Sequence, residues 1–367
     1  MPALTRRSLL RSTSLAAATA LAADRKLSVA FITEPGGTHL ELMVSGLAKC
    51  SGIGSVSLAD ESAQSFDRIR ALLEPAGHQL RTFTAIPEML KVAKPDLTVV
   101  TVEARHNPRL AQLALASRSH VLCEKPPCLH LAEFESLAAT ARSANRQLML
   151  AMATRSNPSI TQARNVIQKG WLGKPYGVAM TWVGDQTRLT TASWQQMWVS
   201  HKNRAGGGKL AFHGIHYLDL IQYLTDDRIV SVSGLCRNVG GQPLDVEDAA
   251  VLALRFRGGA TGTLNTGYYL DKGNSNVVEL WGDKGWIRFD PFVPLRWHST
   301  HPEAPKGEQT EKYESTNGDY DRMMAQAIRG TSGGAPFMTT DESLHLMKVI
   351  FAGYRASETG DTQRVGS

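Results

Sequence analysis

Short apolar runs alternate with longer amphipathic runs from Leu27 to about residue 150. In chain order the apolar runs are LSVAFIT, GSVSLAD, LTVVTV, HVLCE and QLMLAMA, and the short run GHQLRTF between the second and third fits an additional strand. Strands that alternate with helical segments are typical of a parallel sheet with helices on both faces. The pattern therefore predicts an α/β domain with a doubly wound parallel sheet over residues 23–150.

The pattern changes after residue 150. Asn157 and Pro158 predict the start of a helix, because asparagine caps helices and proline is favoured in their first turn. Further on, DAAVLALRF and TGTLNTGYYL, and then VVELWG and GWIRFD, are joined by short turn-like segments that predict hairpins. Two helices are expected near 320–329 and 340–356, after an exposed loop at 299–319. Residues 151–367 are thus expected to form an α+β domain with a large, open, mostly antiparallel sheet.

The first 22 residues have a different composition. They contain the twin-arginine pattern TRRSLLR, the apolar run LAAATALA and a cleavage-like Ala20-Leu21-Ala22. These features are typical of a twin-arginine signal peptide, with a disordered basic tail or an uncleaved anchor as alternatives. We therefore expect export to the periplasm by the twin-arginine machinery, which carries folded proteins and commonly those with a bound cofactor.

Composition excludes several other classes of function. The chain has 367 residues, of which 42% are hydrophobic and 20% charged, and it has no apolar run long enough for a mature membrane span. Its formal charge of +6 includes three signal-peptide arginines, and no lysine or arginine stripe is present, so we expect no nucleic-acid partner. The four cysteines lack metal-site spacing, so we expect no metal and scattered buried thiols, with a disulfide as the alternative.

Three motifs carry chemistry: HVLCEKPP at 120–127, RSNP at 155–158 followed by KGWLGKPYGV at 169–178, and GGGKLAFHGIHYLDL at 206–220. Together they closely resemble the Gfo/Idh/MocA family over about 27–356. The resemblance implies a Rossmann domain that binds NAD or NADP, and a second domain whose open sheet carries the substrate site and often the oligomer interface. It also implies a small-molecule carbohydrate substrate, because members oxidise or reduce sugars, cyclitols and their derivatives, and a homodimer or homotetramer. Some exported members keep the nicotinamide bound.

Glu124 and Lys125 follow a predicted strand, where ligands bind in doubly wound folds. In the family this lysine lies near nicotinamide and substrate, so the resemblance implies cofactor contact for Glu124 and a catalytic role for Lys125. A buried ammonium beside a carbinol can hydrogen-bond the oxygen whose proton moves, and burial lowers its pKa towards the working range. The alternative for Lys125 is a solvated surface charge.

The glycines at 206–208 precede a predicted helix in which family members usually carry Asp and His four residues apart. His216 matches the histidine, and we assign it a catalytic role, but Phe212 stands at the aspartate position. His213 is turned about 100° from Phe212 on a regular helix, so we expect it to contact substrate without replacing the missing carboxylate. Asp219, one turn on, is a further candidate for substrate binding or for orienting a neighbour.

Arg155 and Asn157 match an R-x-N-P element that lies near the active site in the family. The alternatives are a surface ion pair and a helix cap, and the cap explains Asn157 at least as well. Asp185 and three tryptophans, Trp182, Trp194 and Trp198, precede the glycine run and could bind a sugar ring, although tryptophan more often packs in a core or interface.

The expected nucleotide turn, VAFITEPGGTHLEL at 29–42, lacks the G-x-G-x-x-G fingerprint, whose glycine positions are Thr33, Pro35 and Thr38. Gly36 and Gly37 can still form a tight turn with amides that face a phosphate, because pyrophosphate binding depends on those amides and on the helix N-terminus. A second departure is Val102-Glu103, which replaces the Thr-Pro pair that the family usually has after the fourth strand.

Thr38 and His39 can donate hydrogen bonds to a phosphate. Asp60 ends the second strand, where an acid binds the ribose 2′-hydroxyl and repels the extra phosphate of NADP. We therefore expect a variant cofactor site that prefers NAD to NADP and binds it tightly.

Three functions are compatible with these residues. The first is an NAD(P)-dependent oxidoreductase of a sugar, cyclitol or derivative, in which Lys125 and His216 handle the hydroxyl proton. The second is an NAD-dependent glycoside hydrolase or lyase that oxidises its sugar transiently and cleaves by elimination. The third is a sugar-binding relative without catalysis, which the altered turn and Phe212 would favour.

Overall fold

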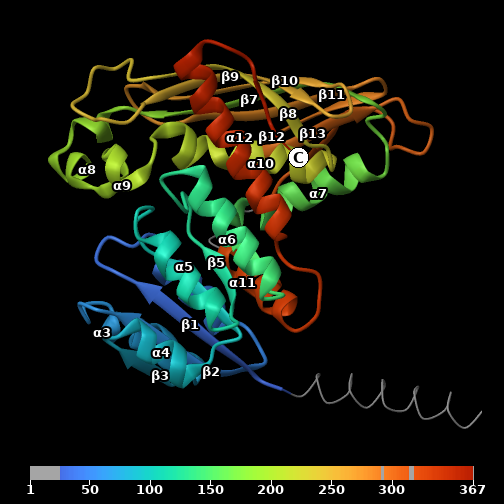
Figure 1. Ribbon diagram of the computed structural model, residues 1–367. Coiled ribbons are helices and arrows are strands. Elements are labelled where there is room, and N and C mark those ends of the chain that lie inside the picture. The colour runs from blue at the N-terminus through green and yellow to red at the C-terminus, as the bar shows by residue number, and fades with distance from the viewer. Residues whose placement is uncertain (1–24, 291–292, 314–317, 367) are drawn as a thin grey trace, which may run out of the picture.

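The computed structural model of the chain describes residues 25–290, 293–313 and 318–366. The expected signal peptide, residues 1–22, lies outside them. Figure 1 shows a smaller N-terminal sheet domain below a wide second sheet, with helices between the two. Within the described residues no helix is both long enough and apolar enough to cross a membrane.

Six parallel strands form the first sheet in the order β3-β2-β1-β4-β5-β6. They are β1 (Leu27–Thr33), β2 (Ile53–Asp60), β3 (Leu80–Phe83), β4 (Leu97–Thr101), β5 (His120–Cys123) and β6 (Leu148–Leu150). The helices between them are α2 (Leu40–Ala48), α3 (Phe66–Leu73), α4 (Ile86–Ala93), α5 (Asn107–Ala116) and α6 (Leu131–Ser143). The predicted doubly wound sheet, including the additional strand β3, is confirmed.

The central strands of this sheet are apolar because both of their faces are covered. Every residue of β4 is buried, and in β1 only Ser28 is partly exposed. The strand order reverses between β1 and β4, so the carboxyl ends of these two strands flank the point where ligands bind in doubly wound folds.

Nine strands form the second sheet in the order β14-β13-β12-β11-β7-β10-β9-β8-β15. They are β7 (Pro175–Asp185), β8 (Ile229–Arg237), β9 (Ala249–Phe256), β10 (Thr261–Leu270), β11 (Ser275–Gly282), β12 (Gly285–Asp290), β13 (Val293–Ser299), β14 (Gln309–Glu311) and β15 (Gln363–Arg364). Only β7 and β10 pair in parallel; the other neighbours are antiparallel.

Both predicted hairpins, β9–β10 and β11–β12, are confirmed. Strand β14 lies inside the stretch expected to be a loop. It is a three-residue edge strand of polar residues that pairs with β13 through its backbone. No alternation of apolar residues therefore predicts it.

The remaining helices are α7 (Pro158–Gln168), α8 (Ala192–Gln196), α9 (Lys202–Ala205), α10 (Ile215–Thr225), α11 (Gly318–Thr331) and α12 (Thr340–Thr359), and short 3₁₀ turns cover 74–76, 153–156, 187–190 and 198–200. Helices α7, α10 and α12 lie on the side of the second sheet that faces the first domain (Figure 1). Along β9, buried residues alternate with the exposed Val251, Ala253 and Arg255, so the opposite face of the sheet reaches solvent.

The C-terminal helices return to the first domain. Gly46 in α2 lies so close to α11 that a Cβ there would be 2.9 Å from the Tyr320 carbonyl oxygen, and Lys49 pairs with Asp321 at 2.6 Å. At the start of α12, Thr340 Oγ1 accepts a hydrogen bond from the Leu148 amide of β6 at 2.9 Å. The chain end therefore holds the two domains together and brings α11 beside the nucleotide turn.

Candidate active site

Lys125 lies just beyond the end of β5 and is 3% exposed. Its Nζ donates a hydrogen bond to the Phe212 carbonyl oxygen at 3.3 Å, lies 3.8 Å from Glu124 Oε1, and sits 3.7 Å from the centre of the Phe212 ring. Burial lowers the pKa of Lys125, and the charge of Glu124 opposes this only in part. The amine is thus held in place and shielded from water, and its charged form is less favoured than that of an exposed lysine.

The glycine run allows the backbone before α10 to pass close to its neighbours. A Cβ on Gly208 would lie 2.1 Å from the Glu247 carbonyl oxygen, and a Cβ on Gly207 would lie 1.9 Å from the Tyr354 hydroxyl oxygen. The next residues form a π-helical turn, Leu210–Gly214, before α10 begins. Because its hydrogen bonds span five residues, the turn departs from the regular spacing assumed from the sequence.

As a result, His213 and His216 both contact Trp182 of β7. The ring centres of Trp182 and the two histidines are 4.9 and 5.5 Å apart. Burial, together with the charge of Lys125, lowers the pKa of His216 well below its usual value, so this imidazole is neutral at pH 7. Its Nδ1 is buried without a hydrogen-bond partner among the described residues.

His213 has a different environment. Its Nδ1 lies 3.3 Å from the Tyr268 hydroxyl, and its ring meets those of Phe212 and Tyr268 edge to face. Burial and then the charge of Lys209 lower its pKa well below the usual value. That His213 contacts substrate without replacing the missing carboxylate stays a prediction.

His39 joins the cluster from the start of α2. Its Nδ1 is 3.2 Å from Glu124 Oε1, an ion-pair distance without hydrogen-bond alignment, and its ring centre is 5.5 Å from that of Tyr320 in α11. The structure places His39 beside Glu124, and its expected hydrogen bond to a phosphate stays a prediction. Tyr320 was missed, because no local pattern shows that α11 packs against α2.

Gly36 and Gly37 form the predicted tight turn after β1. A Cβ on Gly37 would lie 2.1 Å from the Thr101 carbonyl oxygen of β4, and Gly36 has a φ of 90°. The indole nitrogen of Trp198 donates to the Gly36 carbonyl oxygen at 3.0 Å. Of the three tryptophans considered for sugar binding, Trp198 is therefore buried against the nucleotide turn.

The negative charge of Glu103 is paired with arginines of the chain. It forms a bidentate ion pair with Arg204 and lies 2.8 Å from Arg105, while Glu34 accepts hydrogen bonds from the Glu103 amide and from His106. Burial alone would raise the pKa of Glu103, but the hydrogen bond and charge of Arg204 outweigh it and lower the pKa. Donor atoms of Glu34, Glu103 and His106 lie within 4.8 Å of one another, yet these ion pairs account for them without a metal.

The carboxylate of Asp60, which was expected to bind ribose, already accepts several hydrogen bonds from within the chain. Its two carboxylate oxygens accept four hydrogen bonds from the amides and hydroxyls of Ser62 and Ser65, and the residue is 2% exposed. Burial alone would raise the pKa of Asp60, but these bonds hold it below its usual value. Asp60 therefore stays ionised at the end of β2. Little of its carboxylate is exposed for contact with a ribose hydroxyl.

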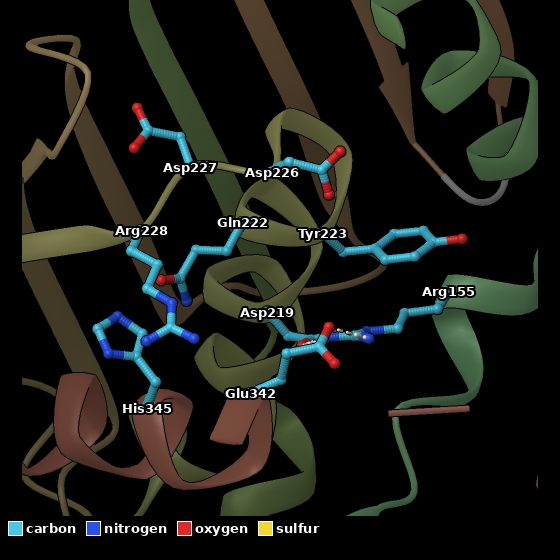
Figure 2. A pocket seen from close by; sticks show the side chains of 9 residues that line it. All are labelled: Arg155, Asp219, Gln222, Tyr223, Asp226, Asp227, Arg228, Glu342 and His345. Carbon is cyan, nitrogen blue, oxygen red and sulfur yellow. Dashed lines mark hydrogen bonds and ion pairs between the residues drawn. The ribbon is translucent and has the colours of Figure 1, made fainter. Parts of the chain in front are cut away.

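Arg155 and Asp219 lie in a different pocket, which Figure 2 shows from close by. They form a buried bidentate pair at 2.6 and 2.8 Å, and Arg155 also bonds Glu342 of α12 at 3.0 Å. The pocket has a volume of about 210 Å³ and shares no lining residue with the Lys125 cluster. The pair thus connects the 153–156 turn, α10 and α12, and its expected role in substrate binding stays a prediction.

Two further candidates have local roles. Asn157 accepts from Ser159 at the start of α7, as expected for a helix cap, and donates to Asp319. Asp185 accepts from the amide and hydroxyl of Thr187. Substrate contact by either residue stays a prediction.

Unsatisfied buried atoms indicate where a ligand fits. Thr38 Oγ1, Glu124 Oε2 and His216 Nδ1 are buried without a hydrogen-bond partner among the described residues, and such atoms are costly unless a ligand or water satisfies them. They come from the start of α2, the end of β5 and the start of α10. Helix α2 also has no side-chain cap for its first amides. These groups fit a dinucleotide: the start of α2 would hold its phosphates, and Glu124 and Lys125 would lie beside its nicotinamide.

Models of one protein family match both halves of the chain. The model described as an oxidoreductase family with an NAD-binding Rossmann fold matches residues 51–152, and the GFO/IDH/MocA C-terminal domain model matches residues 160–288. Together the two matches cover more than half of the chain. The first match begins after the altered glycine turn.

Individual relatives agree with this assignment. The chain is 22% identical over 307 residues to a myo-inositol 2-dehydrogenase of Thermotoga maritima, covering 81% of this chain and 87% of that protein. It is 25% identical over 292 residues to a D-glucoside 3-dehydrogenase of Escherichia coli, covering 74% and 80%.

Among solved structures, an oxidoreductase domain protein from Kribbella flavida superposes with a TM-score of 0.82 at 22% identity, covering 94% of this chain and all of that one. A levoglucosan dehydrogenase in complex with NADH and levoglucosan gives a TM-score of 0.79 at 17% identity, covering 93% and 100%. These structures share the fold. From the two family matches, the chain belongs to the Gfo/Idh/MocA family of NAD(P)-dependent oxidoreductases.

Proposed function

We propose that the protein oxidises or reduces a secondary alcohol of a sugar, cyclitol or sugar derivative, with Lys125 and His216 handling the hydroxyl proton. The observation that carries this proposal is the convergence of Lys125, Glu124 and His216 at the ligand-binding edge of the first sheet, with buried polar atoms that lack partners. The named activities of the relatives on inositol, glucosides and levoglucosan support this substrate class.

Lys125 and His216 have different parts in the proposed reaction. The ammonium of Lys125 hydrogen-bonds the carbinol oxygen, and His216, kept neutral by burial, accepts the hydroxyl proton during oxidation. Glu124 balances the charge of Lys125 at 3.8 Å. Bound NAD supplies the acceptor for the hydride.

We further propose that NAD is preferred to NADP and stays tightly bound. The buried negative charge of Asp60 at the end of β2 would repel a ribose phosphate. The Trp198 bond to Gly36 and the ion pair of Arg204 with Glu103 tie residues of the second domain to the turn and to the loop after β4. Both contacts would slow release of a dinucleotide.

Export to the periplasm by the twin-arginine machinery is proposed from residues 1–22. Replacing Arg6 and Arg7 by lysine should retain the protein in the cytoplasm, and cell fractionation checks this. An interface between copies of the chain is proposed at the outer face of the second sheet, where Leu235, Val251 and Trp281 are exposed at 55, 50 and 39%.

The test of the catalytic proposal is a substrate panel. Purified protein is incubated with NAD and a set of sugars, glycosides and inositols, and NADH formation is followed by absorbance. We expect at least one member to give turnover that is lost with the Lys125→Met variant. Sustained cleavage of an aryl glycoside without added cofactor would instead support the hydrolase or lyase alternative. No turnover and no cleavage, in protein that binds NAD, would contradict the proposal.

A further inference from the structure

Glu124 connects Lys125 to His39, a residue that the proposed mechanism does not use. One carboxylate oxygen, Glu124 Oε1, lies 3.8 Å from Lys125 Nζ and 3.2 Å from His39 Nδ1. Glu124 is 1% exposed and Lys125 is 3% exposed, whereas the side chain of His39 is 31% exposed. The buried amine, the buried carboxylate and the imidazole therefore form a chain of groups in which His39 is the member that reaches solvent.

The arrangement of Glu124 and His39 does not serve local structure. Both carboxylate oxygens of Glu124 and the Nδ1 of His39 are buried without a hydrogen-bond partner among the described residues. His39 stands at the N-cap position of α2, but its side chain forms no cap hydrogen bond there. Its φ of 60° is left-handed, which is uncommon for a residue with a Cβ and occurs most often at functional sites.

Titratable groups face His39 from three other elements. Tyr320 of α11 packs its ring 5.5 Å from the imidazole, Glu124 follows β5, and His216 of α10 is close enough for the charge of His39 to lower its pKa. Burial raises the pKa of Tyr320, so its hydroxyl keeps its proton. Glu124 is thus the neighbour at a distance and in a state to exchange a proton with His39 Nδ1.

The proposed reaction needs a route for one proton. In the oxidation, the carbinol carbon gives a hydride to NAD and the carbinol oxygen loses its proton, so that the products are a carbonyl compound, NADH and one proton. That proton must leave the site before the next cycle, and in the reduction a proton must enter. Burial disfavours the charged forms of His216 and Lys125, so neither residue is a favourable final store for it.

We propose that Glu124 and His39 form a proton relay between the amine of Lys125 and water, with His39 as its outer group. This inference rests on the proposed function for the reaction and adds the path of its proton. Lys125 passes a proton to Glu124, Glu124 passes it to His39 Nδ1, and His39 releases one from Nε2 to water; His216 then returns the hydroxyl proton to the amine. The reduction uses the same groups in the opposite direction. Hydrogen bonds of this kind are often poorly aligned in a ligand-free site and tighten when ligands bind.

The test follows proton transfer at Lys125 directly and needs no substrate. In protein with isotope-labelled lysine side chains, NMR measures the exchange of the Lys125 Nζ protons with water, with and without NAD, and Lys125→Met identifies the signal. We expect the exchange to slow by about tenfold or more in His39→Gln and in Glu124→Gln. His78→Gln, which removes a partly exposed histidine just before β3, should leave the rate unchanged.

Added imidazole distinguishes a relay from a structural role. It should restore the exchange rate in His39→Gln, because the missing group lies at the exposed end of the chain of groups, but not in Glu124→Gln, because that position is buried. An unchanged rate in His39→Gln, no rescue of this variant by imidazole, or equal rescue of both variants would overturn the inference. Failure of the proposed function is recognised separately, as absence of NADH formation with the substrate panel.

Discussion

At the scale of single residues, burial decides the chemistry of the site. Lys125 and His216 are common residue types, and burial disfavours the charged form of each, which is the property that the proposed mechanism uses. The sequence motifs predicted these two residues and Glu124 at one edge of the sheet, and the structure brings them together. The sequence analysis did not consider Lys209, although a lysine at a predicted buried position is itself an indication of a special role.

Replacing Lys125 by Met should lower kcat by about 10²- to 10⁴-fold, the usual contribution of a positioned acid or base. The apolar side chain fills similar space, so the variant should stay folded, which thermal unfolding checks. Steady-state rates on a substrate found in the panel, with Lys284→Met as the control, measure the effect. A rate within about twofold of the native one would remove Lys125 from the mechanism.

Lys209 also makes a prediction about stability and pH. Its pKa of about 7 in the folded chain lies below the usual value of 10.5, so between these pH values the unfolded chain binds one more proton and stability rises with pH. Lys209→Met should therefore be more stable than the native protein at pH 7, by on the order of 5 kcal/mol at most. The difference should shrink towards pH 10, and urea unfolding at several pH values measures it. A destabilised variant at pH 7 would indicate that Lys209 is paired.

At the scale of elements, close contacts between backbones define the nucleotide turn better than the G-x-G-x-x-G motif does. The missing G-x-G-x-x-G motif left the nucleotide turn in doubt, yet Gly37 packs against the end of β4 where a side chain cannot fit. Sequence reasoning placed the strands and hairpins well, since apolar alternation marks them. It did not predict the π-helical turn before α10, because a one-residue change in helical spacing leaves no mark in an apolar run.

Gly37→Ala should weaken NAD binding by at least about tenfold, because its Cβ would lie 2.1 Å from the Thr101 carbonyl oxygen and the turn must shift. Gly177→Ala is the matched control, since the nearest atom to its Cβ is in the Trp281 side chain at 3.4 Å. Fluorescence titration with NADH compares the two variants. Equal affinity in both would mean that the turn does not hold the dinucleotide.

At the scale of the whole molecule, ion pairs with at least one buried partner join segments that are distant in the sequence. Arg155, Asp219 and Glu342 link the start of the second domain, α10 and α12, and the same α12 contacts β6 of the first domain. The R-x-N-P motif located Arg155, but its partners could not be predicted, because they depend on how α12 folds back on both domains. The same holds for Tyr320 and for Arg204 with Glu103.

Removing the cation of this network should be costly. Arg155→Met leaves Asp219 buried without its partner and should destabilise the fold by about 3–5 kcal/mol. Arg164→Met, which breaks the more exposed pair with Asp226, should cost about 1 kcal/mol or less. Thermal unfolding of both variants checks the contrast, and similar losses would mean that the buried pair has no special role.

The most direct test of the whole account is whether the folded protein holds nicotinamide. Purified protein is denatured and the released NAD(H) quantified by absorbance and mass, and cofactor-free protein is then titrated with NADH while tryptophan fluorescence is followed, since Trp198 contacts the Gly36 turn. The account predicts one NAD(H) per chain, either released or bound on titration. No nicotinamide released and no response to NADH would contradict it.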